Sequence, residues 1–247
     1  MINSTIVEKI RETPSTITFR FYWEEKVLPG QFIMIWVPGY GEIPMSLSFT
    51  GKKKGITVKA YGVPSRKLQE LEPGDRIFFM GPYGKPFTES HGKRLLIGSG
   101  SGMASLLPLV NQDSTVIVSA RNREELLYIG KMQAERVVTI TDDGSSGFKG
   151  LPHEYLASMD LSVFQRLYVC GPEVMMFKLL PLLMKAGVKA EFSLERSMKC
   201  GIGICDSCSI DGFQLCTEGP VVSIEKLSGL NEFGKWKLDH SGKRIEV

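Results

Sequence analysis

The chain has 247 residues, of which 43% are hydrophobic, 23% charged and 9% aromatic, so it is neither disordered nor collagen-like. With 30 Lys and Arg against 27 Asp and Glu, and no basic block among aromatic residues, we expect no nucleic-acid partner. No apolar window is long enough to span a membrane and the first residues lack a secretory signal, so we expect a cytoplasmic protein without membrane contact.

Up to about residue 88, the sequence predicts short β-strands. Their residues are rich in β-branched and aromatic types, and Pro-Gly and Gly-Asp turns separate them. The expected strands cover 15–21, 32–37, 46–49, 55–61 and 76–80. Regular short strands of this kind indicate a small antiparallel barrel. One helix is expected within it at 65–70, with Ser65 as its N-cap.

From about residue 93, strands alternate with helices, which indicates βαβ units and a parallel sheet. The expected strands cover 94–97, 115–119, 136–140, 166–170 and 188–193, and the expected helices 103–111 and 173–186. The remaining residues form a Gly- and Cys-rich loop, a short apolar run and a polar tail. We therefore expect three domains, at 1–90, 91–195 and 196–247.

Four of the five cysteines lie close together in the last of these domains. They are Cys200, Cys205, Cys208 and Cys216. Their C-x4-C-x2-C…C spacing is typical of plant-type [2Fe–2S] sites, and Gly201 and Gly203 allow the backbone to approach a cluster closely. A structural zinc is the main alternative, although only Cys205 and Cys208 have the C-x2-C spacing that zinc favours. Inert buried thiols are a second alternative.

A glycine-rich loop follows the expected strand at 94–97. Its glycines, Gly98, Gly100 and Gly102, would let the backbone approach a pyrophosphate at the start of the next helix. The loop departs from the G-x-G-x-x-G pattern, and tight packing alone is an alternative explanation. Arg121 and Arg123 follow the next strand, where an acidic ribose ligand would stand, so the choice between NAD and NADP stays open.

Two more loops follow the carboxyl ends of expected strands, where open α/β sheets bind ligands. Asp142 lies in the first loop, either as a ligand of ribose hydroxyls or as part of a solvated turn. Cys170, Gly171 and Pro172 form the second. A free cysteine is often a small buried hydrophobic residue, but the position of Cys170 favours a thiol beside a nicotinamide.

Together, these motifs resemble the ferredoxin–NAD(P) reductase superfamily, over essentially the whole chain. The segment 193–208 is similar to the cluster segment of one branch, the electron-transfer subunits of class 1B dihydroorotate dehydrogenases. Further similar stretches are Ile43 to Ser48, Gly81 to Gly84, Thr141 to Ser145 and the Cys-Gly-Pro-Glu-Val-Met run from Cys170.

The resemblance implies a β-barrel domain that binds FAD, an α/β domain that binds NAD and a C-terminal [2Fe–2S] module. It places Pro44, Met45, Ser46 and Leu47 along the flavin, and Gly62 to Ser65 at its pyrophosphate. It places Gly98, Gly100, Gly102, Asp142, Cys170, Gly171 and Pro172 on the nicotinamide side, with Cys170 as the catalytic residue, and makes the four clustered cysteines the metal ligands.

The implied activity is an electron relay in pyrimidine biosynthesis. Dihydroorotate is oxidised on an FMN-containing catalytic subunit, and electrons pass through the [2Fe–2S] cluster and FAD to NAD⁺. The implied assembly is a hetero-oligomer, expected to be a heterotetramer. Alone, this chain would oxidise NADH with artificial acceptors.

Two features depart from the family pattern. Ile43 stands where the flavin motif normally has an arginine, so either another cation, such as Lys59 or Arg66, neutralises the FAD phosphates or FAD binds more weakly. The spacing from Cys208 to Cys216 is also short.

Two other functions are compatible with these motifs. Similar modules serve NADH-dependent ferredoxin:NADP oxidoreductases, sulfide dehydrogenases and soluble hydrogenases, which differ in their partners. A zinc-stabilised nucleotide sensor without enzymatic activity is the alternative from another class.

Overall fold

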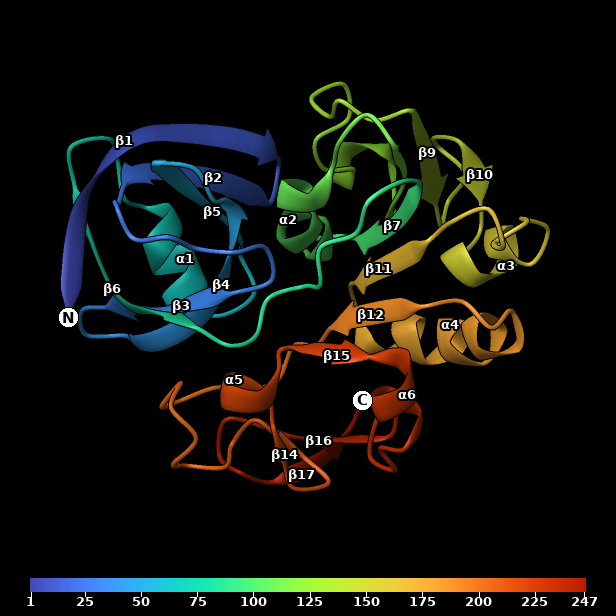
Figure 1. Ribbon diagram of the computed structural model, residues 1–247. Helices are drawn as coiled ribbons and strands as arrows, with labels where there is room; N and C mark the ends of the chain where they lie inside the picture. The colour runs from blue at the N-terminus through green and yellow to red at the C-terminus, as the bar shows by residue number, and fades with distance from the viewer.

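The computed structural model describes residues 1–247. Its N-terminal part is a closed antiparallel barrel with the strand order β1-β2-β5-β4-β3-β6 (Figure 1). The strands are β1 (Ile2–Thr13), β2 (Thr16–Tyr22), β3 (Phe32–Val37), β4 (Gly41–Phe49), β5 (Lys53–Lys59) and β6 (Arg76–Tyr83). Phe19, Phe21, Ile35 and Phe79 fill the barrel, and closure leaves no exposed sheet edge. The expected barrel is confirmed.

Strand β1 was not expected from the sequence. It pairs with β2 on one side and with β6 on the other, so it is the strand that closes the barrel. Only Ile6 and Thr13 of its residues are buried. A strand with so few buried side chains lacks the apolar alternation by which strands are recognised in a sequence.

The expected N-cap of the barrel's helix was wrong. Helix α1 (Val63–Gln69) begins two residues earlier, and its N-cap is Gly62. Pro64 suits the first helical turn because proline has no N–H group to leave unpaired there. The Ser65 hydroxyl instead accepts hydrogen bonds from the N–H groups of Tyr61 and Gly62, each at 3.0 Å. Ser65 therefore stabilises the helix start from inside the helix.

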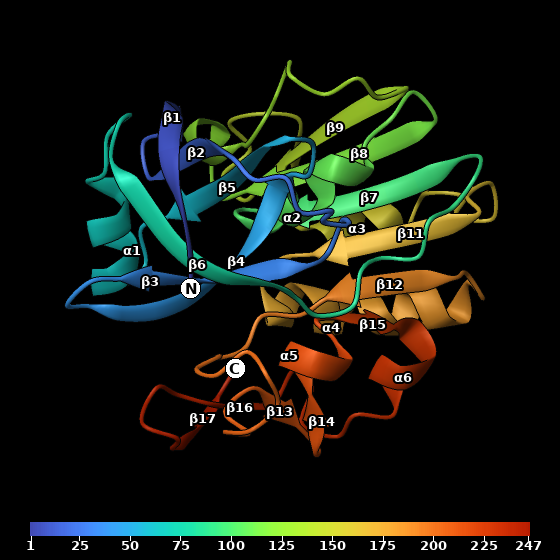
Figure 2. The same cartoon turned by 60° about the vertical axis from the view of Figure 1, so that its left-hand side comes forward.

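The second part of the chain is a seven-stranded sheet with the order β10-β9-β8-β7-β11-β12-β15. Neighbouring strands are parallel except β15, which runs antiparallel to β12 (Figure 2). The strands are β7 (Arg94–Ser99), β8 (Ser114–Ala120), β9 (Arg136–Thr141), β10 (Phe148–Lys149), β11 (Arg166–Cys170), β12 (Ala190–Ser193) and β15 (Val221–Ser223). The connecting helices are α2 (Gly102–Leu106), η1 (Leu107–Leu109), η2 (Arg123–Glu125), α3 (Pro152–Leu156) and α4 (Glu173–Lys185).

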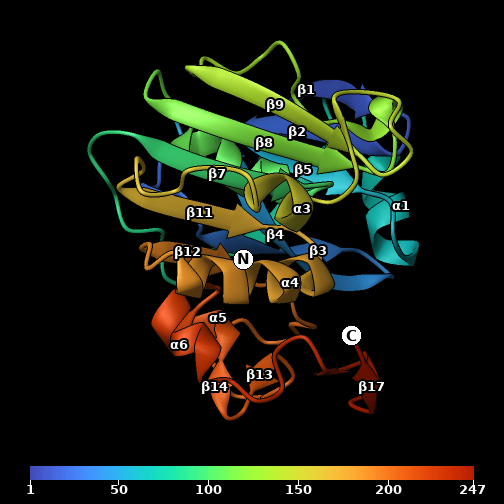
Figure 3. The same cartoon turned by 90° about the vertical axis from the view of Figure 1, so that its right-hand side faces the viewer.

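Alternate residues of the central strands face two separate cores. Leu95 and Ile97 of β7 pack with α3 and α4, which lie in front of the sheet in Figure 3. Leu96 faces the other core, together with Tyr168 and Cys170. That second core also contains residues of α2, the helix that lies between the sheet and the barrel in Figure 1. Cys170 therefore lies on the face of the sheet that is turned toward the barrel.

The C-terminal part lies beside the edge of the sheet that β12 and β15 form (Figure 1). Its elements are β13 (Ser209–Ile210), β14 (Phe213–Gln214), α5 (Leu215–Glu218), α6 (Ile224–Ser228), β16 (Trp236–Leu238) and β17 (Arg244–Glu246). Because β15 pairs with β12, this part of the chain is joined to the sheet by backbone hydrogen bonds. None of the helices is long and apolar enough to cross a membrane.

Candidate functional site

The cysteine-rich loop directs backbone N–H groups at its own sulfur atoms. The N–H groups of Ile202 and Ile204 lie 3.5 and 3.4 Å from Cys200 Sγ, and that of Gly203 lies 3.2 Å from Cys216 Sγ. Gly201 and Gly203 have φ angles of +70° and +78°, a backbone conformation that favours glycine. N–H donors aimed at sulfur stabilise thiolates, which are the form of cysteine that binds metal.

The four thiols lie in two pairs. The Cys205 thiol helps to lower the pKa of Cys200. Burial and the Cys208 thiol raise the pKa of Cys216, whose N–H lies 3.4 Å from Cys208 Sγ. Two cysteines for each of two irons is the ligand arrangement that a [2Fe–2S] cluster requires. The donor set and its pairing therefore fit a two-iron cluster.

Local hydrogen bonding favours the thiolate form of Cys200. Its partial burial opposes ionisation, but the N–H groups of Ile202, Cys205 and Ile204 outweigh that effect and lower the pKa of the thiol to about 6. Cys208 and Cys216 are buried, whereas Cys205 is exposed. The loop thus has one buried side and one side that faces solvent.

The cysteine loop packs directly against the barrel. A Cβ atom at Gly201 would lie 3.0 Å from Met34 Cγ and 3.3 Å from the ring of Tyr83. Met34 of β3 pairs with Pro44 of β4, the first residue of the proposed flavin motif. The loop therefore contacts the strand next to that motif, and a cluster held in it would lie close to the barrel's flavin face.

The proposed flavin residues lie on β4. Pro44, Met45 and Ser46 are half-buried, and Leu47 belongs to the barrel core. Ile43 pairs with Ile35 and packs against the same core, so an apolar side chain fills the place of the family's arginine.

The two cations considered as replacements have different surroundings. Lys59 Nζ lies 2.8 Å from a carboxylate oxygen of Glu125, in the second part of the chain. Arg66 Nη2 donates to the carbonyl oxygen of Tyr61 at 3.2 Å, next to Gly62 and the start of α1. Arg66 thus has a backbone carbonyl as its partner near the expected pyrophosphate loop, whereas Lys59 has an acidic one.

The glycine-rich loop and the Cys170 loop lie side by side. A Cβ atom at Gly102 would lie 2.5 Å from the carbonyl carbon of Cys170, and one at Gly171 would lie 2.8 Å from Ser99 Cβ. These contacts bring together two loops that are far apart in the sequence, at the carboxyl ends of the paired strands β7 and β11. Pro172 follows as the N-cap residue of α4.

Three more residues were expected on the nicotinamide side: Gly98, Gly100 and Asp142. Gly98 packs against Met103, and Gly100 takes a positive φ of +53°. Asp142 is exposed after β9, and its N–H donates to the carbonyl oxygen of Ala120 at 3.2 Å. Two strands, β8 and β7, stand between β9 and the Cys170 strand, so Asp142 belongs to a separate part of the same sheet edge.

The thiol of Cys170 is buried within the second core. Burial, followed by the charge of Glu195, raises the pKa of this thiol to about 12, so the group is protonated at neutral pH. Glu195 was missed in the sequence analysis. It follows β12, whose Ser193 pairs with Cys170, and this position after a neighbouring strand was the available signal.

The fold and the cysteine loop define a class of oxidoreductase. The solved structure of an NADH-dependent reduced ferredoxin-NADP oxidoreductase is similar, with a TM-score of 0.81 and 25% identity over 92% of this chain and 90% of that one. The FAD/NAD-binding domain of nitric oxide dioxygenase from Vibrio cholerae has the same fold, with a TM-score of 0.67 and 20% identity over 75% of this chain and 93% of that one. A barrel joined to a parallel sheet is thus the architecture of ferredoxin reductase-type proteins.

Sequence relatives narrow this class further. The family model of the iron-sulfur cluster binding domain of dihydroorotate dehydrogenase B matches residues 195–228. A relative from Thermoplasma volcanium is 50% identical over 100% of this chain and 99% of its own length, and one from Methanothermobacter thermautotrophicus is 38% identical over 96% and 94%. Both are named probable dihydroorotate dehydrogenase B (NAD(+)), electron transfer subunit. The chain belongs to the family of dihydroorotate dehydrogenase B electron transfer subunits, which removes support for a zinc-stabilised sensor.

Proposed function

We propose that this chain passes electrons from a dihydroorotate dehydrogenase catalytic subunit that carries FMN, through a [2Fe–2S] cluster and FAD, to NAD⁺. In this proposal, the protein works in pyrimidine biosynthesis in the cytoplasm. It forms a hetero-oligomer with that subunit. One observation supports the proposal above the others: Gly201 of the cysteine loop contacts Met34, the β-sheet partner of Pro44. The cluster loop and the flavin motif are therefore close neighbours.

The proposed roles follow the three parts of the fold, with domain boundaries at 1–90, 91–195 and 196–247. Cys200, Cys205, Cys208 and Cys216 hold the cluster. Pro44 to Leu47 line the flavin, Gly62 to Ser65 approach its pyrophosphate, and Arg66 lies nearest to that loop. Gly98, Gly100, Gly102, Asp142, Gly171 and Pro172 bind the nicotinamide nucleotide, and Cys170 acts beside its reacting ring.

The chain's own residues control access and charge in this relay. A bound flavin supplies the exchange between single-electron and hydride chemistry. The positive φ angles of Gly201 and Gly203 let the N–H groups of Ile202 and Gly203 point at the sulfur atoms, and such hydrogen bonds are one of the factors that set a cluster's potential. The Cys170 thiol lies in the core next to the glycine-rich loop and is neutral at physiological pH, so it adds no charge to the proposed nicotinamide site. Gly102 allows the glycine-rich loop after β7 to approach Cys170 closely.

A second candidate keeps the cofactors and changes the partner. The similarity to an NADH-dependent reduced ferredoxin-NADP oxidoreductase, over 92% of this chain, favours a ferredoxin-linked reductase as this alternative. Both functions need the same three binding sites, so only the identity of the electron donor separates them.

The decisive experiment is NAD⁺ reduction driven by dihydroorotate. The chain is co-purified with the dihydroorotate dehydrogenase catalytic subunit of the same organism, and each subunit alone is the control. We expect turnover only in the complex. Loss of this activity, with NADH–dye reduction intact, would overturn the dihydroorotate assignment and leave the cofactor assignments in place.

A further inference from the structure

One segment of the nucleotide-binding part reaches across to the barrel. It follows β8 and includes η2, in which the N–H of Glu125 donates to the Asn122 side chain at 3.2 Å. Leu126, Leu127 and Tyr128 after it are buried. The segment is thus anchored at its start by a side-chain cap and at its end by apolar burial.

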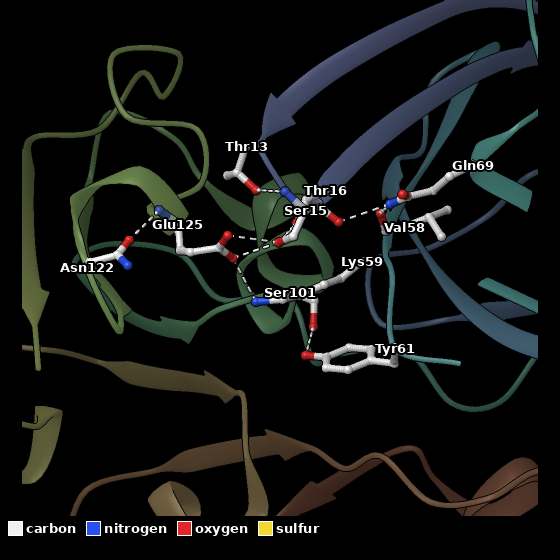
Figure 4. Close-up of polar contacts among 10 residues, drawn as sticks. All are labelled: Thr13, Ser15, Thr16, Val58, Lys59, Tyr61, Gln69, Ser101, Asn122 and Glu125. Atoms are coloured by element: carbon white, nitrogen blue, oxygen red, sulfur yellow. Dashed lines mark hydrogen bonds and ion pairs between the residues drawn. The ribbon is translucent and has the colours of Figure 1, made fainter. Parts of the chain in front are cut away.

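Glu125 binds two barrel residues with its carboxylate (Figure 4). The Ser15 hydroxyl donates to its two oxygens at 2.9 and 2.7 Å, and Lys59 Nζ lies 2.8 Å from one of them. The side chains of Lys59 and Glu125 are only 24% and 19% exposed, so solvent screens their attraction less than it screens a surface pair. Partial burial raises the pKa of Glu125, but Lys59 and Ser15 outweigh this and lower it.

A second residue of the segment, Tyr128, binds β5, the barrel strand that contains Lys59. The hydroxyl of Tyr128 lies 2.5 Å from Thr57 Oγ1, which is also 2.8 Å from Ser48 Oγ and 2.9 Å from Thr18 Oγ1. Thr57 and Lys59 are two positions apart on β5, so their side chains lie on the same face of the strand. The segment therefore holds this end of β5 at two neighbouring points.

The contacts between this segment and β5 lie close to a proposed nucleotide-binding loop on each side. On the barrel side, β5 continues into Gly62 and the start of α1. On the other side, the N–H of Gly100 donates to the carbonyl oxygen of Ser119 of β8, at 2.9 Å. Where the two loops face each other, the hydroxyls of Tyr61 and Ser101 lie 3.4 Å apart (Figure 4).

We propose that Glu125 and Lys59 act as a positioning pair. The pair fixes the glycine-rich loop that contains Gly100 relative to the flavin-binding barrel, and so sets the alignment of the nicotinamide and the flavin for hydride transfer. Lys59 is committed to this pair and does not bind the FAD phosphates. The inference rests on the proposed use of FAD and NAD, but not on dihydroorotate as the electron source. Reaction rates depend steeply on such alignment, because a displacement of about 1 Å can cost on the order of 100-fold.

The test compares Glu125→Gln, Lys59→Met and the double variant in the full chain loaded with FAD and cluster. Flavin reduction by NADH is followed in single turnovers, together with the FAD content per chain and the thermal midpoint. For each single variant, we expect a limiting rate lower by roughly 10-fold, with FAD content and half-saturation by NADH unchanged. The double variant should be no slower than either single variant, because one interaction is lost in all three.

Two further variants separate alignment from general damage. Lys59→Arg keeps the ion pair and should restore most of the rate. Glu124→Gln removes a neighbouring exposed carboxylate for which the structure gives no ion pair, and it should react at the rate of the unmodified chain.

Three outcomes would overturn the proposal: loss of FAD in Lys59→Met alone, an unchanged rate in Glu125→Gln, or a double variant whose rate loss is the product of the single losses. Failure of the dihydroorotate assignment would be seen separately, because the NADH reaction needs no partner subunit.

Discussion

Arg196 and Glu173 form an ion pair of 2.6 Å whose side chains are only 2% and 8% exposed. Glu173 is the first residue of α4, directly after the Cys170 loop, and Arg196 precedes the first cluster cysteine. Arg196 also donates to the carbonyl oxygen of Trp236 at 2.6 Å, and Glu173 accepts from the N–H of Gly234 at 2.7 Å. The pair therefore joins the nucleotide-binding sheet, the cluster loop and the C-terminal tail at one buried point.

Replacement of Arg196 by Met should destabilise the protein strongly. It would leave the Glu173 carboxylate buried without its counter-charge, a change that costs about 3–5 kcal/mol. Chemical unfolding of the loaded chain measures this cost. Lys93→Met is the matched control, because its pair with Glu135 is 57% and 48% exposed, and it should cost less than about 1 kcal/mol. Equal costs for the two variants would contradict a special role for the buried pair.

Gly201→Ala should reduce the iron content of the chain. The added methyl group would meet Met34 and Tyr83, so the cysteine loop would move away from the barrel. Gly212→Ala is the control, because Gly212 has a similar φ of +78° but nothing within 4 Å of its Cβ position. An alanine at either position destabilises the left-handed backbone conformation by about 1 kcal/mol. Only Gly201→Ala also places a methyl group against Met34 and Tyr83. Iron and acid-labile sulfide per chain are the measurements, and equal losses would show that contact with the barrel is unimportant.

Cys216→Ala should remove most of the iron and the associated visible absorbance. Cys216 lies outside the loop 200–208, on α5, but its sulfur accepts the Gly203 N–H and is paired with Cys208. Cys170→Ala, which changes the one cysteine buried in the other core, should keep its iron. Full iron content in Cys216→Ala would mean that another group serves as the fourth ligand.

Local patterns made much of this structure predictable. The β3 and β11 boundaries agree with the sequence, because both are short apolar runs between clear turn signals. The cysteine spacing predicted the cluster module because all four ligands lie within one short stretch of chain. Sequence reasoning recognises features of this kind, since neighbouring residues determine them.

The features that were missed depend on contacts between distant residues. Strand β1 is defined by its partners β2 and β6, not by its own apolar pattern. Glu125 meets Ser15 across 110 positions, and nothing near either residue signals the contact. The sequence predicts Ser65 as the N-cap because serine is common at that position, but its hydroxyl acts inside the first turn of the helix.

The pKa of Cys170 makes a prediction about stability at alkaline pH. Burial raises it from an ordinary value of 9.0 to about 12, so the folded chain retains a proton that the unfolded chain releases above pH 9. The thiol's contribution is fully present below pH 9 and is lost as the pH rises toward 12, at up to about 1.4 kcal/mol per pH unit. Chemical unfolding of the natural chain and Cys170→Ala, at about pH 8 and about pH 10, tests this. The natural chain should lose more stability between the two conditions than the variant, which lacks the titrating group. An equal loss would mean that the thiol ionises as readily in the folded chain as in the unfolded one.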